Sequence, residues 1–140
     1  MTLFVLDAST TLSWHFQDEV TEATRAIARN AFGGGVAVPQ HWFLEVASAL
    51  LRGERRERTS GAATSAFLSR LLELDTEVHA LSAHQVFSSV IPLARSHRLS
   101  VYDAAYLELA HRLALPLATR GGPLRAAAVA LNMDVIGDEA

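Results

Sequence analysis

Three acidic side chains of this 140-residue sequence stand among apolar residues, where an unpaired carboxylate is costly to bury. Asp7 follows the apolar run 3–6, Glu45 lies in the middle of an apolar segment, and Asp103 lies within the largely apolar segment 99–110. Carboxylate oxygens are the ligands that Mg²⁺ and Mn²⁺ prefer, and such ions support phosphoryl-transfer chemistry. The sequence therefore predicts a divalent-metal site, provided that the fold brings these acids together.

Each of these acids also has a purely structural interpretation. Asp7 suits the N-cap position where a strand turns into a helix, and Asp103 suits a capping box with Ser100. Glu45 suits the solvated edge of a helix, although no Lys or Arg stands three or four residues away from it. The functional interpretation gains weight because all three acids share apolar surroundings.

Missing residue types exclude several kinds of site. All twelve basic residues are Arg, so there is no Lys for a Walker-type phosphate loop, a Schiff base or a receiver domain. No Cys is present, which excludes disulfides, thiol nucleophiles and thiolate metal sites. The six His are scattered and lack the spacing of a zinc protease. Carboxylates are therefore the main groups available for chemistry.

Length and composition predict a single globular domain over residues 1–140. Half of the residues are hydrophobic, and the net charge of −3 gives no bulk attraction to nucleic acid. No apolar run reaches the roughly 20 residues of a membrane span. The N-terminal residues lack a basic leader, so we expect a cytoplasmic protein with no membrane partner.

Alternating strands and helices must position the acids. Apolar runs predict strands at 3–6, 36–38, 115–119 and 135–136, and alternating apolar and polar residues predict a short strand at 77–81. The predicted helices are a short one after Asp7, then 18–29, 39–51 with Pro39 in its first turn, 60–74, 82–94 with a bend at Pro92, 99–113 and 124–131. This alternation predicts an α/β fold with a mostly parallel sheet and helices on both faces. Asp7 then lies at the carboxyl edge of the sheet, where chemistry collects in such folds.

Four arginines form a basic run at the end of the third helix. Arg52, Arg55, Arg56 and Arg58 stand among acidic residues, which is typical of a solvated helix end and loop. The alternative is a patch that follows the phosphates of a nucleic-acid strand, since the guanidinium fork matches phosphate geometry.

Four segments in a suitable order resemble a known family. They are Val5-Leu-Asp-Ala-Ser9 with Trp14 and Asp18-Glu19 after it, Val38-Pro39 followed by Trp42-x-x-Glu45-x-x-x-Ala49-Leu50, Val101-Tyr-Asp-Ala-Ala-Tyr-Leu-Glu-Leu-Ala110, and Pro116-Leu-Ala-Thr119 with Leu124 and Ala126-Ala127. Over nearly its whole length the chain is similar to PIN-domain proteins, specifically VapC-type toxins of type II toxin–antitoxin pairs. This resemblance implies a three-layer α/β/α sandwich with about five short strands.

The resemblance also implies roles for individual residues. The family's catalytic and metal-binding acids carry over to Asp7, Glu45 and Asp103, and Ser9 and Thr119 are expected to supply hydroxyl groups beside them. We expect Asp7 and Asp103 to hold one Mg²⁺, with Glu45 reaching it directly or through water.

One position departs from the family pattern. Members usually carry a further acid two residues after Thr119, where this chain has Gly121. The neighbouring Arg120 is either an exposed turn residue or a partial replacement, with its guanidinium paired to the acids or to the scissile phosphate.

The activity implied by the resemblance is that of a Mg²⁺-dependent endoribonuclease toxin, with Mn²⁺ as a possible substitute. The implied partners are an RNA substrate, a cognate VapB-type antitoxin that inhibits the toxin, and a second copy in a homodimer. The alternative is a catalytically weakened PIN domain that binds RNA or protein, because the fourth acidic position is Gly121.

Overall fold

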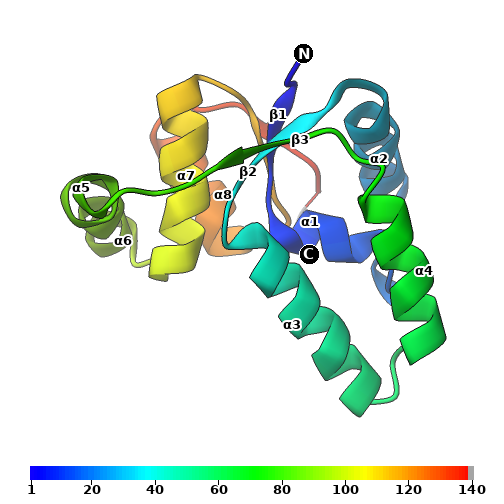
Figure 1. Ribbon diagram of the computed structural model, residues 1–140. Helices are drawn as coiled ribbons and strands as arrows, with labels where there is room; N and C mark the ends of the chain where they lie inside the picture. Colours follow the sequence, from blue (N-terminus) through cyan, green and yellow to red (C-terminus); the bar gives the residue numbers. More distant parts are fainter. Residues whose placement is uncertain (139–140) are drawn as a thin grey trace.

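The fold, seen in a computed structural model that describes residues 1–138, is built around one five-stranded sheet (Figure 1). The strand order is β3-β2-β1-β4-β5, and all neighbouring strands are parallel. The strands are β1 (Phe4–Leu6), β2 (Val36–Pro39), β3 (Thr76–His79), β4 (Leu117–Ala118) and β5 (Val135–Ile136). The predicted α/β fold with a central sheet is confirmed, and the sheet is entirely parallel.

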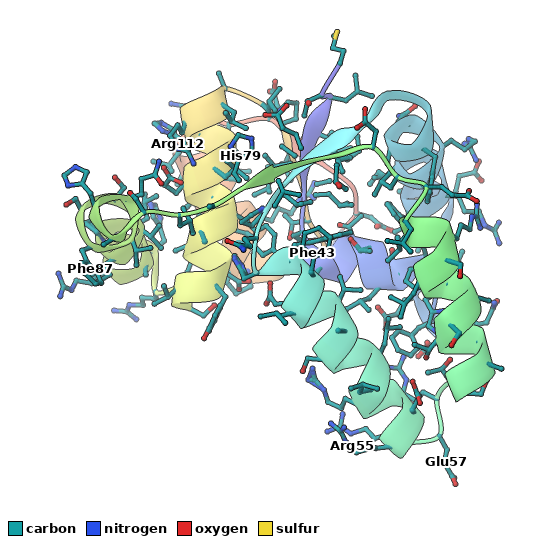
Figure 2. The ribbon with its side chains drawn as sticks, viewed as in Figure 1. Phe43, Arg55, Glu57, His79, Phe87 and Arg112 are labelled. Atoms are coloured by element: carbon teal, nitrogen blue, oxygen red, sulfur yellow. The ribbon has the colours of Figure 1, made fainter. Side chains whose placement is uncertain are left out.

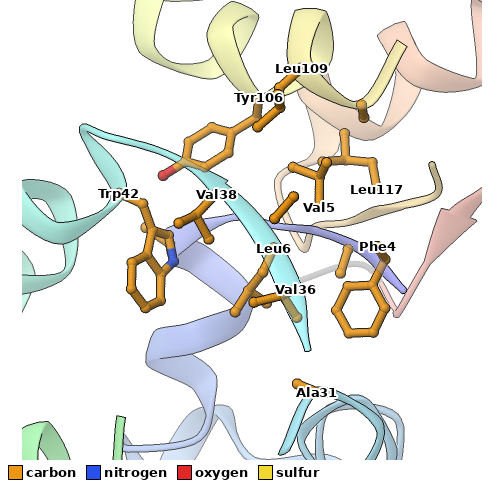
Figure 3. Packing of buried hydrophobic residues seen from close by; sticks show 14 of the residues in the cluster. Phe4, Val5, Leu6, Ala31, Val36, Val38, Trp42, Tyr106, Leu109 and Leu117 are labelled. Atoms are coloured by element: carbon orange, nitrogen blue, oxygen red, sulfur yellow. The ribbon is translucent and has the colours of Figure 1, made fainter. Parts of the chain in front are cut away.

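The central strands are covered on both faces, which explains their continuous apolar sequence. Every residue of β1 and β2 is buried. Helix α7 (Val101–Leu113) places Tyr106 and Leu109 against one face, and α2 (Glu22–Gly34) places Ala31 against the other (Figure 3). Packing on both faces holds β1 firmly, and Asp7 comes directly after its last residue.

Further helices surround this core. They are α1 (Ala8–Ser13), α3 (Trp42–Arg55), α4 (Gly61–Leu71), α5 (Ala83–Gln85), α6 (Ile91–His97) and α8 (Gly122–Ala130). Helix α7 contacts β1, β2 and β4, and both α6 and α8 pack against α7. Helices α3 and α4 project beyond the carboxyl ends of the strands (Figure 1). The start of α3 therefore lies at the same edge of the sheet as Asp7.

The second helix begins later than predicted because local capping decides its start. Thr21 and Thr24 form a capping box, so α2 begins at Glu22. Asp18 and Glu19, which were predicted to open this helix, lie instead in a short 3₁₀ turn, η1 (Gln17–Glu19).

Pro39 also lies in a different element from the one predicted. It is the last residue of β2 and pairs with His79 of β3, whereas α3 begins only at Trp42. The missing N–H of Pro39 does not break the pairing, because the next N–H, that of Gln40, donates to the carbonyl oxygen of His79 at 3.0 Å.

The helix predicted to bend at Pro92 changes its winding just before the proline. Residues Val86–Val90 form a π-helical segment, η2, between α5 and α6. A proline lacks the N–H that an α-helix needs, and a wider turn accommodates that loss. A bilayer-spanning helix is absent from residues 1–138, since none combines enough length with enough apolar character.

Candidate active site

Asp7, Glu45 and Asp103 line one hollow of about 270 Å³ at the carboxyl edge of the sheet. Each comes from a different element: Asp7 is the N-cap of α1, Glu45 lies near the start of α3, and Asp103 lies in the first turn of α7. The fold thus brings together three carboxylates that are far apart in the sequence. Gly121 lines the same hollow.

Asp7 is buried and held by several donors. Its carboxylate accepts hydrogen bonds from the hydroxyl of Ser9 at 2.8 Å, from the backbone N–H of Thr10 at 2.9 Å and from the hydroxyl of Thr119. Burial nevertheless raises the pKa of Asp7 from 3.8 to about 6, because these donors offset only part of the loss of hydration. The hydrogen bond from Thr10 confirms that Asp7 is the N-cap of α1. Capping alone does not explain why a carboxyl group is buried deeply enough to have a raised pKa.

Hydrogen bonds tie Asp7 to α3 through the protein interior. The indole N–H of Trp42, the first residue of α3, donates to the hydroxyl of Thr11 at 3.0 Å. That hydroxyl in turn donates to the backbone carbonyl of Asp7 at 2.8 Å. Both Trp42 and Thr11 are buried, so this link between the two elements is shielded from water.

Glu45 has two partners that the sequence analysis did not identify. The hydroxyl of Tyr106 donates to its carboxylate at 2.6 Å, and Nε2 of His41 lies 3.4 Å away. Burial acts to raise the pKa of Glu45, but the contacts with His41 and Tyr106 outweigh it and hold the pKa below its usual range. The pKa of Tyr106 is raised by burial and by Glu45, so the phenol stays protonated and keeps donating.

Both missed partners have a signal in the sequence. His41 precedes Glu45 by four residues, which places the two on one face of a helix. Tyr106 follows Asp103 by three residues, which places the two on the same face of α7. His41 was not counted as a partner because an imidazole carries a charge only when protonated, yet the structure places its Nε2 beside Glu45.

Asp103 is the least satisfied of the three acids. Its backbone N–H donates to the hydroxyl of Ser100 at 3.1 Å, but within residues 1–138 its carboxylate has no hydrogen-bond or ion-pair partner. Only half of the predicted capping box forms, and the carboxylate is left at the hollow. Burial and the negative charge of Glu45 raise the pKa of Asp103, and His41 acts in the opposite direction.

The predicted hydroxyl groups, Ser9 and Thr119, both contact Asp7. Ser9 also accepts a hydrogen bond from the backbone N–H of Arg120 at 3.1 Å, and Thr119 accepts one from the N–H of Gly121 at 3.0 Å. A Cβ atom at Gly121 would meet the Thr119 hydroxyl at an ordinary 3.5 Å. The position of the missing acid therefore has room for a side chain.

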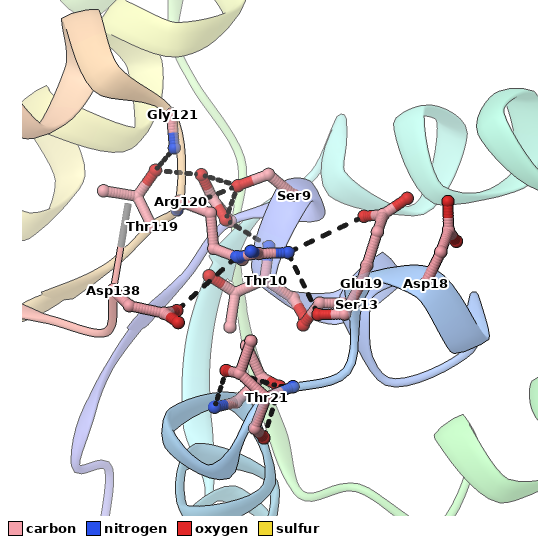
Figure 4. A network of polar contacts seen from close by, with 12 residues as sticks. Ser9, Thr10, Ser13, Asp18, Glu19, Thr21, Thr119, Arg120, Gly121 and Asp138 are labelled. Carbon is pink, nitrogen blue, oxygen red and sulfur yellow. Dashed lines mark hydrogen bonds and ion pairs between the residues drawn. The ribbon is translucent and has the colours of Figure 1, made fainter. Parts of the chain in front are cut away.

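The side chain of Arg120 points to a different set of acids. Its Nη1 donates to the carbonyl oxygen of Glu19 at 3.1 Å, and its Nε lies 3.6 Å from Oδ1 of Asp138 (Figure 4). Arg120 is only 9% exposed, so it is not an exposed turn residue. The guanidinium is therefore not paired with Asp7, which accepts a hydrogen bond from the preceding residue, Thr119.

The hollow fits a hard divalent cation by the chemistry of its donors. Carboxylate oxygens are its main ligands, and burial raises the pKa values of two of its acids, Asp7 and Asp103. Residues 1–138 contain no group of three or more His, Asp or Glu side chains already close enough to hold a metal ion between them. Mg²⁺ commonly binds through one or two carboxylates and keeps several waters, so the ion does not require such a group.

Comparison with known proteins places the chain in context. The family model described as "PIN domain" matches residues 4–130. Among solved structures, the chain is similar to the protein PAE2754 from Pyrobaculum aerophilum, with a TM-score of 0.69 and 23% sequence identity over 98% of this chain and 90% of that one. At this identity the similarity supports the fold alone. No curated protein matches at a significant level.

Proposed function

The chain belongs to the PIN domain family, and we propose from this premise that it is a metal-dependent endoribonuclease. PIN domains are generally nucleases and typically use divalent metal ions. The observation that carries the proposal is the hollow itself, in which Asp7, Glu45 and Asp103 converge at the carboxyl edge of the sheet.

The residues around the hollow suit the steps of phosphodiester hydrolysis. When bound, Mg²⁺ supplies a Lewis acid that orients water and offsets charge on the phosphate. Asp7 is held in one orientation by Ser9 and Thr119, so its carboxylate is preorganised as a ligand. The carboxylate of Asp103 is unpartnered within residues 1–138 and lines the hollow, so it is available to hold the ion or to accept a proton from the attacking water.

Cleavage of RNA by matched variants tests this proposal. Purified protein is incubated with a labelled, structured RNA in Mg²⁺ or Mn²⁺, beside Asp7→Asn and beside Asp134→Asn, an exposed aspartate outside the hollow. We expect cleavage by the wild type and by Asp134→Asn, and none by Asp7→Asn or after addition of EDTA. Equal cleavage by Asp7→Asn and the wild type would contradict the proposal.

A second candidate function, a module that binds RNA or protein without cutting, is favoured by one observation. Gly121 removes a carboxylate from the wall of the hollow, and fewer ligand charges weaken the binding of a divalent ion. The same assay decides between the two functions, because RNA binding without cleavage by the wild type in either metal indicates the module.

Within the nuclease proposal, the finer candidate is a VapC-type toxin that acts on cytoplasmic RNA and is held inactive by an antitoxin. An exposed apolar hollow of about 330 Å³ between α3 and α4 supports this candidate, since it suits an apolar segment of a partner. Phe43, Leu68 and Leu72 are among the residues that line it.

Induced expression in bacteria is expected to arrest growth with the wild type and not with Asp7→Asn. Unimpaired growth with wild-type protein that cleaves RNA in vitro would count against a toxin.

A further inference from the structure

A second hollow of about 320 Å³ adjoins the hollow of the acids. The two share Ser9 and Leu12 of α1 and Ala49 and Arg52 of α3. From this common wall the second hollow extends to the C-terminal end of α3, where Arg56 and Arg58, just beyond the helix, line it. Together the two hollows form a furrow between α1 and α3, and Arg52 stands at the junction.

The residues of α3 that face the furrow, together with the C-cap residue Arg56, share one stripe of the helix. Glu45, Ala49, Arg52 and Arg56 follow one another at intervals of four, three and four residues, which places them on one side of an α-helix. The helical rise puts Arg52 about 10 Å beyond Glu45 along the axis and Arg56 about 6 Å further. The stripe thus changes from acidic to basic as it leaves the site.

The arginines of the furrow differ in how they are neutralised. Arg58 donates to Asp18 at 2.9 Å and to Glu19 at 3.1 Å, and its guanidinium lies 4.2 Å from the centre of the Phe16 ring. Arg52 and Arg56 are exposed, and within residues 1–138 neither has an acidic partner. Two guanidinium groups are therefore available for an anion in the furrow.

We propose that this furrow binds the backbone of single-stranded RNA next to the cut, with phosphates on Arg52 and Arg56. The inference rests on the proposed nuclease function and names where the substrate lies. A phosphodiester that enters a hollow walled by three carboxylates is repelled by them, and a guanidinium at the mouth offsets this repulsion. Arginine forks bind phosphate oxygens through two parallel hydrogen bonds, which positions the strand without reading its sequence.

Arg55 provides the matched control on the same helix. It is exposed like Arg52 and Arg56, but it lines neither hollow. Figure 2 shows it, with Glu57, at the end of α3 that is remote from the sheet. A patch that attracts RNA only by its overall charge would use all three arginines alike.

The test is the binding of a fluorescent single-stranded RNA to Arg52→Gln, Arg56→Gln and Arg55→Gln in EDTA, where the RNA stays intact. We expect Arg52→Gln and Arg56→Gln each to weaken binding about 10-fold, since each removes charge-assisted hydrogen bonds. Each should also reduce the slope of log K against log salt by about 0.7, the value for one phosphate contact on a single strand. Arg55→Gln should change neither quantity. Thermal unfolding of each variant shows whether its fold is intact.

The outcomes separate this inference from the nuclease proposal. Equal binding by Arg52→Gln and the wild type, or equal weakening by all three variants, would overturn the furrow even where the wild type cleaves RNA. A wild type that does not cleave, but whose binding depends on Arg52 and Arg56 and not on Arg55, would overturn the nuclease proposal and leave the furrow as an RNA-binding surface.

Discussion

Thr119 and Arg120 are consecutive residues directly after β4, and their side chains enter two different regions. Thr119 faces the hollow of the acids through its hydrogen bond to Asp7. Arg120 faces the other way, into a cluster that consists of its own guanidinium, Glu19 and Asp138, which we call the Arg120 cluster. Both regions are rich in carboxylates, but within residues 1–138 Asp7 and Asp103 of the hollow have no ion-pair partner, whereas Arg120 pairs with both acids of its cluster.

The difference shows which region stabilises the fold and which is kept for chemistry. In the Arg120 cluster, negative charge is offset within the protein, as expected of a structural element. In the hollow, Asp7 and Asp103 have raised pKa values, so their ionised forms oppose folding until a positive charge arrives. Sites that carry out chemistry commonly retain such unfavourable charges, at the expense of stability.

The largest contrast is expected in RNA cleavage after matched acid-to-amide changes in the two regions. We expect Asp103→Asn to lower the cleavage rate at least about 10³-fold, on the order of 4 kcal/mol, because it removes a ligand and a proton acceptor. Asp138→Asn, in the Arg120 cluster, should change the rate less than about threefold. Initial rates under saturating Mg²⁺ measure both. Similar losses of cleavage rate in the two variants would contradict the assignment of catalysis to the hollow and of a structural role to the Arg120 cluster.

The next effect concerns the pH dependence of folding stability at Asp7. Below pH 3.8 the Asp7 carboxyl is protonated in both the folded and the unfolded protein, and above about pH 6 it is ionised in both. The free-energy cost of burying the ionised carboxyl therefore reaches its full size only above about pH 6. A rise of the pKa from 3.8 to about 6 corresponds to about 3 kcal/mol. The stability of Asp7→Asn relative to the wild type should therefore increase by about this amount between pH 3.5 and pH 7 in EDTA.

Urea unfolding at several pH values measures that difference. Asparagine caps helices as well as aspartate, so the variant keeps the start of α1. Asp134→Asn, at an exposed position, is the control and should show no such trend. A constant difference in the free energy of unfolding between Asp7→Asn and the wild type over this pH range would mean that burial does not raise the pKa of Asp7.

A smaller loss of stability is expected from the Arg120 cluster. Arg120→Met keeps much of the buried volume but leaves Asp138 without its cation and leaves Glu19 paired with Arg58 alone. Because these two acids are partly exposed, at 32% and 38%, we expect a loss of about 2 kcal/mol rather than the larger cost of a fully buried pair. Urea unfolding at pH 7 measures the loss, and Arg95→Met, at an exposed arginine, is the control. An unchanged unfolding midpoint would show that the cluster contributes nothing to stability.

The smallest effect is expected from returning an acid to the hollow. Gly121→Asp places a carboxylate in the wall of the hollow, where a Cβ atom meets only ordinary contacts. We expect the affinity for Mn²⁺ to rise about 10-fold, about 1.4 kcal/mol, since affinity follows the number of ligand charges. Calorimetric titration measures it. Gly122→Asp, next to it but not in the wall of the hollow, should bind Mn²⁺ as the wild type does, and equal gains for both variants would refute a specific role of position 121.

Much of this arrangement follows from sequence patterns, because those patterns report burial and period. The continuous apolar run before Asp7 predicts a strand covered on both faces, and the parallel sheet then places Asp7 at its carboxyl edge. Pro39 was assigned to the wrong element because a proline is compatible both with the first turn of a helix and with the end of a strand.

The side-chain contacts are harder to predict, since they depend on how distant elements pack. The hydrogen bond from Tyr106 to Glu45 joins α7 to α3, and no local pattern encodes it. The direction of Arg120 is different in kind. If the strand pattern of 115–119 is continued by one residue, Thr119 on the side of Asp7 puts Arg120 on the opposite side.

The buried link from Trp42 through Thr11 to Asp7 has a consequence for how the protein responds to its ionic surroundings. Dissolved ions do not reach hydrogen bonds in a dry interior, so the separation of α3 from the end of β1 is insensitive to salt. Affinity for a polyanion weakens steeply as salt increases. Raising the salt concentration should therefore release RNA while the catalytic framework stays assembled, so that turnover lost at high ionic strength returns on dilution.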